Sequence, residues 1–268
     1  MKINIAKSAG FCFGVKRAVE KVYANVDKEH VYTYGPIIHN EQVVADLEKH
    51  GVKVVEEDTD LTQLSEGTIV VRAHGASRAE FDRLRECGMQ IEDATCPFVS
   101  KIYRIVEEES KAGRTVIIVG NAAHPEVRGI RGWSGEDTYV VGSIEEANNL
   151  NILAKNISIV SQTTFNLKKF KEIVEIFEKK GYDIKCLNTI CNATEVRQTE
   201  ARQIASQVDA MIVIGGKNSS NTQKLFEICK EECSNTYYIQ TAEDLDYTAI
   251  RGMQRIGITA GASTPKNI

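Results

Sequence analysis

The stretch Asp93-Ala94-Thr95-Cys96-Pro97-Phe98-Val99 decides the fold, because a short apolar run ends in it and a helical pattern begins. Pro97 suits the first turn of a helix, where the N–H that proline lacks has no intrahelical partner. Cys96 is therefore expected at or next to the N-cap, where the helix dipole favours a thiolate or a metal held by thiolates. A lone cysteine in this setting is more often a small buried residue. Cys12 and Cys191, however, occupy the same setting.

Counting from these three cysteines shows a repeat. One set of loop residues follows the cysteines after 27, 28 and 28 residues, namely His39, His124 and Ser219. A second set follows them after 62, 67 and 72 residues, namely His74, Thr163 and Ser263. Helical patterns cover residues 15–26, 98–111 and 193–208, and strands alternate with helices throughout. This alternation predicts an α/β fold of three similar modules with mainly parallel sheets and right-handed crossovers.

We expect module 1 at residues 14–95, module 2 at 96–190, and module 3 at 191–268 together with 1–13. The strand at 3–6 matches the strands that precede Cys96 and Cys191, so it is expected to complete module 3 and bring the chain ends together. Three modules around a pseudo-threefold axis would bring the three cysteines to the centre. Module 3 lacks a helix after Ser263, so a longer natural chain is expected.

The composition is that of an ordinary soluble protein. The chain has 268 residues, of which 42% are hydrophobic and 26% charged. Its net charge of -4 and pI near 5.8 argue against nucleic acid as the main partner. It has no apolar run of roughly 18 residues that would span a membrane, and no signal peptide at its start, so we expect a cytoplasmic location. Seven cysteines in such a chain favour metal binding or catalysis over disulfides.

The predicted site lies beyond the carboxyl ends of the strands, where open parallel sheets bind ligands. Three thiolates suit either a tetrahedral zinc ion with an open fourth position or a cubane iron–sulfur cluster with one iron that lacks a protein ligand. The loops around them offer donors beside helix N-termini, which favour a phosphate or diphosphate. These donors are His39, His74, His124, Ser219, Ser220, Asn221 and Ser263, whereas His30 and His50 are expected at the surface.

Glu126 is the only carboxylate directly in one of these loops. With His124 and the hydroxyls of Thr163 and Thr164 it could form a proton relay. The alternative is that Glu126 merely caps the helix that follows it. The remaining cysteines are given no role in the site. Cys229 and Cys233 are four apart on one helix face and could bind metal, but they are interpreted as packing residues, while Cys87 and Cys186 are expected in a helix end and a strand. Nucleotide binding has no support, because no glycine-rich phosphate loop of the known spacings is present.

Nine segments together carry a resemblance to a known family. They are Ala9-Gly10-Phe11-Cys12-Phe13-Gly14-Val15, Gly35-Pro36-Ile37-Ile38-His39-Asn40, Arg72-Ala73-His74-Gly75, Asp93-Ala94-Thr95-Cys96-Pro97, His124-Pro125-Glu126, Ser161-Gln162-Thr163-Thr164, Thr189-Ile190-Cys191-Asn192-Ala193-Thr194, Lys217-Asn218-Ser219-Ser220-Asn221 and Thr259-Ala260-Gly261-Ala262-Ser263. In these segments the chain resembles the 4-hydroxy-3-methylbut-2-enyl diphosphate reductases over essentially its whole length.

The resemblance implies a [4Fe–4S] cluster on Cys12, Cys96 and Cys191 with one open iron. It implies that two electrons and a proton remove the C4 hydroxyl of an allylic diphosphate as water. The products are isopentenyl and dimethylallyl diphosphate, in the methylerythritol phosphate pathway to isoprenoids. Glu126 would be the proton source, helped by Thr163 and His124. The substrate-binding residues would be His39, His74, His124, Thr163, Thr164, Ser219, Ser220, Asn221 and Ser263. Ferredoxin or flavodoxin would supply the electrons.

Two other functions fit the same residues. A zinc-dependent phosphate-ester hydrolase could use the three-cysteine site without an electron donor. A non-catalytic iron–sulfur sensor could use it without a proton donor at Glu126.

Overall fold

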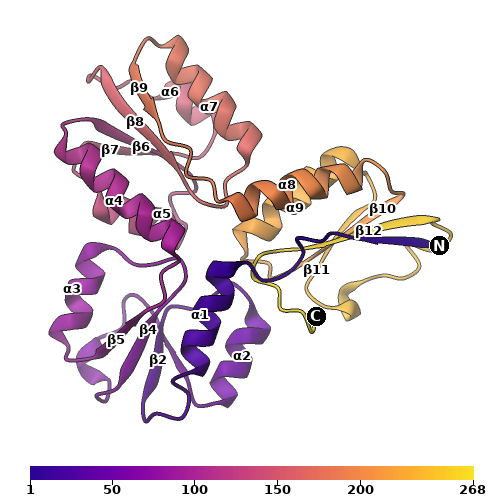
Figure 1. The fold of residues 1–268 in the computed structure, drawn as a ribbon, viewed down its shortest axis with the longest axis horizontal. Helices are drawn as coiled ribbons and strands as arrows, with labels where there is room; N and C mark the ends of the chain where they lie inside the picture. Colours follow the sequence, from indigo (N-terminus) through magenta and orange to yellow (C-terminus); the bar gives the residue numbers. More distant parts are fainter. The chain divides into compact units, whose positions relative to one another are not determined.

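The computed structural model describes residues 1–268, which separate into two compact units. Unit 1 comprises Met1–Lys16, Ile38–Asp46 and Cys191–Ile268, and unit 2 comprises Arg17–Ile37 and Leu47–Ile190. Together they contain three sheets of four strands, and every recorded pairing between strands is parallel. Figure 1 labels most of these strands, all except β1 and β3, and the α-helices that connect them. The predicted α/β fold with three parallel sheets is confirmed.

Unit 1 contains the sheet with the order β1-β12-β10-β11. Its strands are β1 (Lys2–Ile5), β10 (Ala210–Ile214), β11 (Thr236–Ile239) and β12 (Arg255–Ala260). The helices α8 (Asn192–Ala205) and α9 (Ser220–Glu232) and the short 3-10 helix η2 (Ala242–Asp244) belong to the same unit. Strand β1 pairs with β12 in parallel, so the first strand joins the sheet built by the end of the chain, as the sequence predicts.

Unit 2 contains two sheets. The first has the order β3-β2-β4-β5 and consists of β2 (Val31–Tyr34), β3 (Lys53–Val55), β4 (Thr68–Val71) and β5 (Gln90–Asp93). The second has the order β7-β6-β8-β9 and consists of β6 (Thr115–Val119), β7 (Thr138–Val141), β8 (Asn156–Ser161) and β9 (Asp183–Cys186). The remaining helices of the chain are α1 (Phe13–Tyr23), α2 (Glu41–Lys49), η1 (Leu61–Gln63), α3 (Arg78–Glu86), α4 (Pro97–Lys111), α5 (Pro125–Trp133), α6 (Ile144–Asn149) and α7 (Leu167–Lys179).

The three sheets share one strand order, which is the structural form of the sequence repeat. In each sheet the first strand after a cysteine lies between the second and the third, and the fourth strand lies beyond the third. In unit 1 the fourth position is taken by β1. The module boundaries and the pseudo-threefold arrangement stay predictions. None of the helices is both long and apolar enough to cross a membrane.

Each of the three cysteines stands directly before a helix. Cys96 and Cys191 are the N-caps of α4 and α8, and the carbonyl of Cys12 accepts a bond of 2.9 Å from the N–H of Lys16, as an N-cap carbonyl does. The predicted ends 26 and 208 are too late. Helices α1 and α8 end at Tyr23 and Ala205, because the chain leaves both through tight turns whose bonds span three residues.

Apolar side chains between each sheet and its helices form the cores. In unit 2 the core under α7 contains three phenylalanines, of which Phe177 is fully buried among residues from β6, β8 and α7. Its ring centroid lies 6.1 Å from that of Tyr182. This core holds β6 and β8 in the positions from which the loops described below emerge.

We expect Phe177→Ala to lower the free energy of unfolding by about 3–5 kcal/mol, because it leaves a cavity in a close-packed core. Urea unfolding followed by circular dichroism measures the change. Leu153→Ala is the matched control, since Leu153 is fully exposed and its loss should change the stability by less than about 0.5 kcal/mol. A similar small effect for both variants would contradict this packing.

Candidate functional site

Glu126, His124 and Thr163 meet at the carboxyl edge of the β6–β8 pair. Glu126 lies in the first turn of α5, and Thr163 lies in the loop after β8. The Oε1 atom of Glu126 accepts a bond of 2.6 Å from the Thr163 N–H, and Oε2 accepts a bond of 2.8 Å from the Thr163 hydroxyl. The side chain of Glu126 is 2% exposed. Thr163 therefore holds both oxygens of a buried carboxyl group.

His124 is the N-cap of α5. Its Nδ1 atom accepts a bond of 3.1 Å from the N–H of Glu126. Since Nδ1 is the acceptor, the neutral ring carries its proton on Nε2, which remains a donor. The alternative that Glu126 caps its own helix is wrong, because His124 is the capping side chain and the Glu126 carboxyl bonds to Thr163.

Burial raises the pKa of Glu126 to about 7, although the two bonds from Thr163 act in the opposite direction. Desolvation disfavours the charged carboxylate more than the hydrogen bonds favour it. A carboxyl group with a pKa close to neutral is suited to transfer a proton, since both of its protonation states are populated there.

Thr164 is held beside this group by a different contact. The Nε2 atom of Gln162 donates a bond of 3.0 Å to the Thr164 hydroxyl, and Oε1 of Gln162 accepts a bond of 3.2 Å from the N–H of Asn121. Gln162 thus links the loop after β8 to the loop after β6. Gln162 belongs to the motif Ser161-Gln162-Thr163-Thr164, but no role for it is predicted from the sequence.

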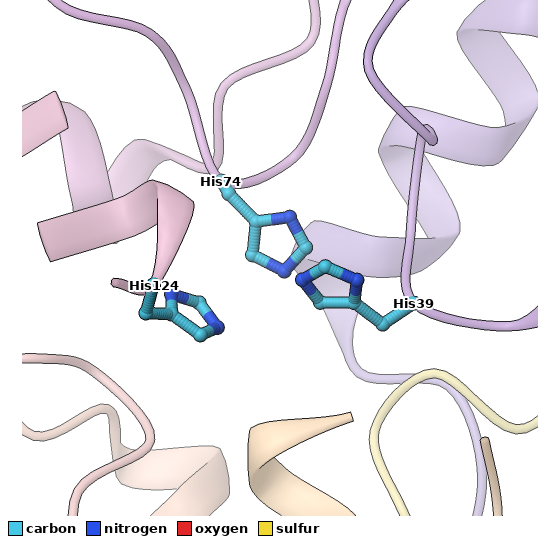
Figure 2. Close-up of side chains that lie close together, drawn as sticks. All are labelled: His39, His74 and His124. Carbon is cyan, nitrogen blue, oxygen red and sulfur yellow. The ribbon is translucent and has the colours of Figure 1, made fainter. Parts of the chain in front are cut away.

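His74 lies next to His124. The two rings pack edge to face (Figure 2), and their centroids are 5.3 Å apart with an angle of 84° between the ring planes. His39, drawn in the same figure, belongs to unit 1. The backbone at His74 is set by Tyr103 of α4, whose hydroxyl donates a bond of 3.2 Å to the His74 carbonyl. Gly75 has a φ of +76°, and a Cβ there would lie 2.1 Å from the Tyr103 hydroxyl, so only glycine fits.

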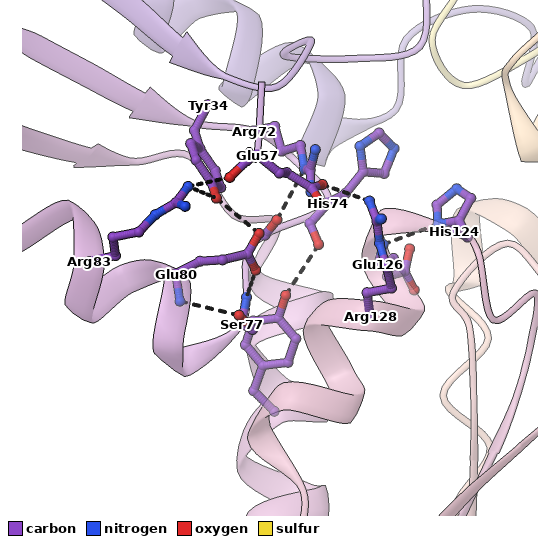
Figure 3. Close-up of polar contacts among 12 residues, drawn as sticks. Tyr34, Glu57, Arg72, His74, Ser77, Glu80, Arg83, His124, Glu126 and Arg128 are labelled. Carbon is purple, nitrogen blue, oxygen red and sulfur yellow. Dashed lines mark hydrogen bonds and ion pairs between the residues drawn. The ribbon is translucent and has the colours of Figure 1, made fainter. Parts of the chain in front are cut away.

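An ionic network with one buried member, Arg72, connects the His74 turn to the Glu126 helix (Figure 3). The guanidinium of Arg72, in a residue only 4% exposed, donates bonds to Glu57 at 2.5 Å and to the carbonyl of Gly75 at 3.3 Å. The same Glu57 oxygen accepts a bond of 2.7 Å from Arg128 of α5. Arg83 donates to the Glu57 carbonyl. This network is not predictable from the sequence, because Glu57 lies in a loop with no motif or spacing that relates it to Arg72 or Arg128.

In unit 1, polar groups gather at the carboxyl ends of β10 and β12. Ser219 is the N-cap of α9. The hydroxyl of Ser263 lies 3.1 Å from the Ser219 hydroxyl and 3.1 Å from the His39 carbonyl. Asn221 accepts a bond of 2.9 Å from the Ala262 N–H, while its Nδ2 group is buried without a partner. Ser220 is the first residue of α9. An unsatisfied donor at a helix N-terminus suits an anion.

Cys12 and Cys191 also lie in unit 1, whereas Cys96 lies in unit 2. All three are partly accessible and none forms a disulfide. Neither capping cysteine, Cys96 or Cys191, makes a side-chain hydrogen bond to its helix. Cys229 and Cys233 are buried, which confirms their interpretation as packing residues, and His30 and His50 are exposed as predicted.

The comparisons with known proteins give the family. A family model described as LytB protein matches residues 3–268. This chain belongs to the LytB family. Curated relatives include the 4-hydroxy-3-methylbut-2-enyl diphosphate reductases of Caldanaerobacter subterraneus, 48% identical over 269 residues, and Geobacter sulfurreducens, 47% identical over 267. Both alignments cover 99% of this chain and 93% of the relative. The resemblance found in the sequence is confirmed.

Two solved structures resemble this LytB-family chain. The E-1-hydroxy-2-methyl-but-2-enyl-4-diphosphate reductase from Plasmodium falciparum superposes with a TM-score of 0.94 at 30% identity, covering 99% of this chain and 85% of its own. An (E)-4-hydroxy-3-methyl-but-2-enyl diphosphate reductase, described as the terminal enzyme of the non-mevalonate pathway, superposes with a TM-score of 0.69 at 41% identity, covering 100% and 96%.

The raised pKa of Glu126 predicts how stability depends on pH. Between pH 4.5 and about 7, Glu126 is protonated in the folded chain and ionised in the unfolded chain. The folded state then binds more protons, so the contribution of Glu126 to the free energy of unfolding falls by about 3 kcal/mol as the pH rises through this range. Glu126→Gln should remove this fall, as measured by urea unfolding at pH 5 and pH 8. The exposed control Glu145→Gln should retain it, and a wild-type slope in Glu126→Gln would contradict the assignment.

Proposed function

We propose that this chain is a 4-hydroxy-3-methylbut-2-enyl diphosphate reductase. It reduces the allylic alcohol to isopentenyl and dimethylallyl diphosphate, as the names of its LytB relatives suggest. The reaction consumes two electrons and two protons. The bond between C4 and its oxygen breaks, one proton completes the water that leaves, and the other forms a new C–H bond. The protein must therefore hold a diphosphate, deliver protons and accept electrons.

The observation that carries the proposal is the buried carboxyl group of Glu126, whose pKa is about 7 and whose oxygens Thr163 holds. Glu126 is the proton source in this account. Thr163 fixes the direction of the carboxyl group and can pass a proton through its hydroxyl. His124 fixes the backbone of Glu126 and presents Nε2–H as a donor.

The residues that we propose to bind the diphosphate are the loop donors predicted from the sequence. Unit 1 supplies His39, Ser219, Ser220, Asn221 and Ser263, and unit 2 supplies His74, His124, Thr163 and Thr164. Support comes from the unpartnered Nδ2 of Asn221 at the start of α9 and from the donor Nε2 of His124 beside His74. The helix dipole and neutral donors offset the negative charge of the phosphates.

The cofactor is a [4Fe–4S] cluster on Cys12, Cys96 and Cys191. When bound, it supplies the electrons and one iron without a protein ligand. The residues fit such a group. The cysteines form no disulfide and are partly accessible, they precede helices, and a buried cation, Arg197, lies beside two of them. The proposal requires Cys96 of unit 2 to meet Cys12 and Cys191 of unit 1.

Ferredoxin or flavodoxin is the electron donor, and the enzyme works in the cytoplasm.

Two alternatives are less well supported. A non-catalytic iron–sulfur sensor transfers no proton to a substrate, so it does not need a buried carboxyl group with a pKa of about 7. Glu126 therefore argues against a sensor. A zinc-dependent phosphate-ester hydrolase would need no electron donor and would release phosphate from the substrate. The family to which the chain belongs argues against the hydrolase.

Metal analysis separates these functions. We expect anaerobically purified protein to be brown and to contain iron and sulfide at about four of each per chain, as a [4Fe–4S] cluster requires. Cys96→Ser should lose most of the iron, whereas Cys186→Ser, in an exposed cysteine of β9, should retain it. Colourless protein with one zinc ion per chain after anaerobic reconstitution would contradict the reductase.

Glu126→Gln tests the proton source. We expect it to retain the cluster and to bind substrate, but to lose turnover by about 10²–10⁴-fold, because Gln cannot transfer the proton. Turnover is measured with a reduced chemical electron donor, and binding by calorimetry. Glu145→Gln is the control for a carboxylate removed from an exposed helix. Unchanged turnover in Glu126→Gln would refute the assigned role.

A further inference from the structure

Arg197 is a buried cation whose charge no carboxylate neutralises by contact. It lies in α8 and is 4% exposed. Its Nη2 donates a bond of 2.6 Å to the carbonyl of Gly10, and its Nη1 donates a bond of 3.0 Å to the carbonyl of Ala193. Its Nε is buried without an acceptor. Two neutral carbonyls and an unsatisfied donor are poor compensation for a buried guanidinium, so a negative charge is expected nearby.

The two carbonyls place this cation between two predicted cluster ligands. Gly10 comes two residues before Cys12, and Ala193 comes two residues after Cys191. Among the acidic groups that act on Arg197, Cys12 and Cys191 have larger electrostatic effects than Glu200. All of these residues belong to unit 1.

Helix α8 also holds the Cys12 segment at a second point. Glu200, three residues after Arg197, accepts bonds from the N–H groups of Lys7 and Ser8 at 2.8 and 2.9 Å. Residues three apart lie on one face of a helix. This face of α8 therefore holds the segment that leads from β1 to Cys12 through hydrogen bonds. Glu200 accepts bonds from two N–H groups of the segment, and Arg197 donates a bond to one of its carbonyls.

We propose that Arg197 is a positioning residue that holds the Cys12 segment against the start of α8 and supplies the fixed positive charge beside the thiolate-ligated cluster. The inference rests on the proposed cluster. The thiolate-ligated cluster carries one more negative charge when it is reduced than when it is oxidised. A nearby cation therefore stabilises the reduced cluster more than the oxidised one and raises the reduction potential. The same cation reduces the repulsion among the thiolates when the cluster is assembled.

The test is an anaerobic redox titration of the cluster-loaded protein, followed by absorbance and electron paramagnetic resonance. We expect Arg197→Gln to favour the oxidised form at least tenfold, which lowers the midpoint potential by about 59 mV for one electron. Arg197→Lys keeps the charge and should stay near the wild-type potential. Arg202→Gln is the matched control, because Arg202 lies in the same helix but pairs with Glu231 and Glu232 at the surface. It should leave the potential unchanged.

Unchanged potential in Arg197→Gln would overturn the inference, and so would an equal shift in Arg202→Gln. If Arg197→Gln folds but binds no iron, recovery of iron in Arg197→Lys supports the inference, and absence of iron from both variants overturns it. A wild-type protein without a cluster would overturn the inference and the proposed cofactor together. A wild-type protein whose cluster responds to Arg197 but does not reduce the substrate would overturn only the proposed function.

Discussion

In each of the three sheets all four strands run parallel, so their carboxyl ends lie at one edge, and helices begin in the loops that leave that edge. The candidate functional residues lie at this edge because the loops that carry them begin there. Glu126 and Thr163 lie in segments that follow the neighbouring strands β6 and β8. Ser219 and Ser263 lie in segments that follow the neighbouring strands β10 and β12. Repetition of one strand order three times therefore builds three edges with different side chains.

Glu126 shows how burial and hydrogen bonding are balanced at such an edge. Full burial would suit a neutral carboxylic acid, while the two bonds from Thr163 suit a carboxylate. The result is a pKa of about 7, between the two extremes. The network from Arg72 through Glu57 to Arg128 anchors the same helix to the His74 turn. The proposed proton transfer and the anchoring thus use separate groups on α5.

Much of the fold and part of the candidate site follow from the sequence. The three cysteines stand at the helix starts that their spacing predicts, and the first strand completes the third sheet. These features depend on local signals, namely a strand end, a proline or a helix start, repeated at similar distances. The contact between Glu126 and Thr163 was also anticipated, because parallel strands bring their loops to one edge.

The supporting residues could not be found in this way. Glu57 contacts Arg72 and Arg128, but the numbers of residues between them do not match the repeat seen in the sequence. No local sequence pattern indicates that Arg197 is buried. Their roles depend on tertiary packing.

The central claim is the proposed iron–sulfur cluster on Cys12, Cys96 and Cys191. The most direct measurement is anomalous X-ray diffraction at the iron edge from crystals of anaerobically prepared protein with bound substrate. The account predicts one compact iron peak in contact with the sulfurs of Cys12, Cys96 and Cys191, with the substrate between this peak and the carboxyl group of Glu126. An iron peak that contacts only other residues, or a peak at these three sulfurs only at the zinc edge, would contradict it.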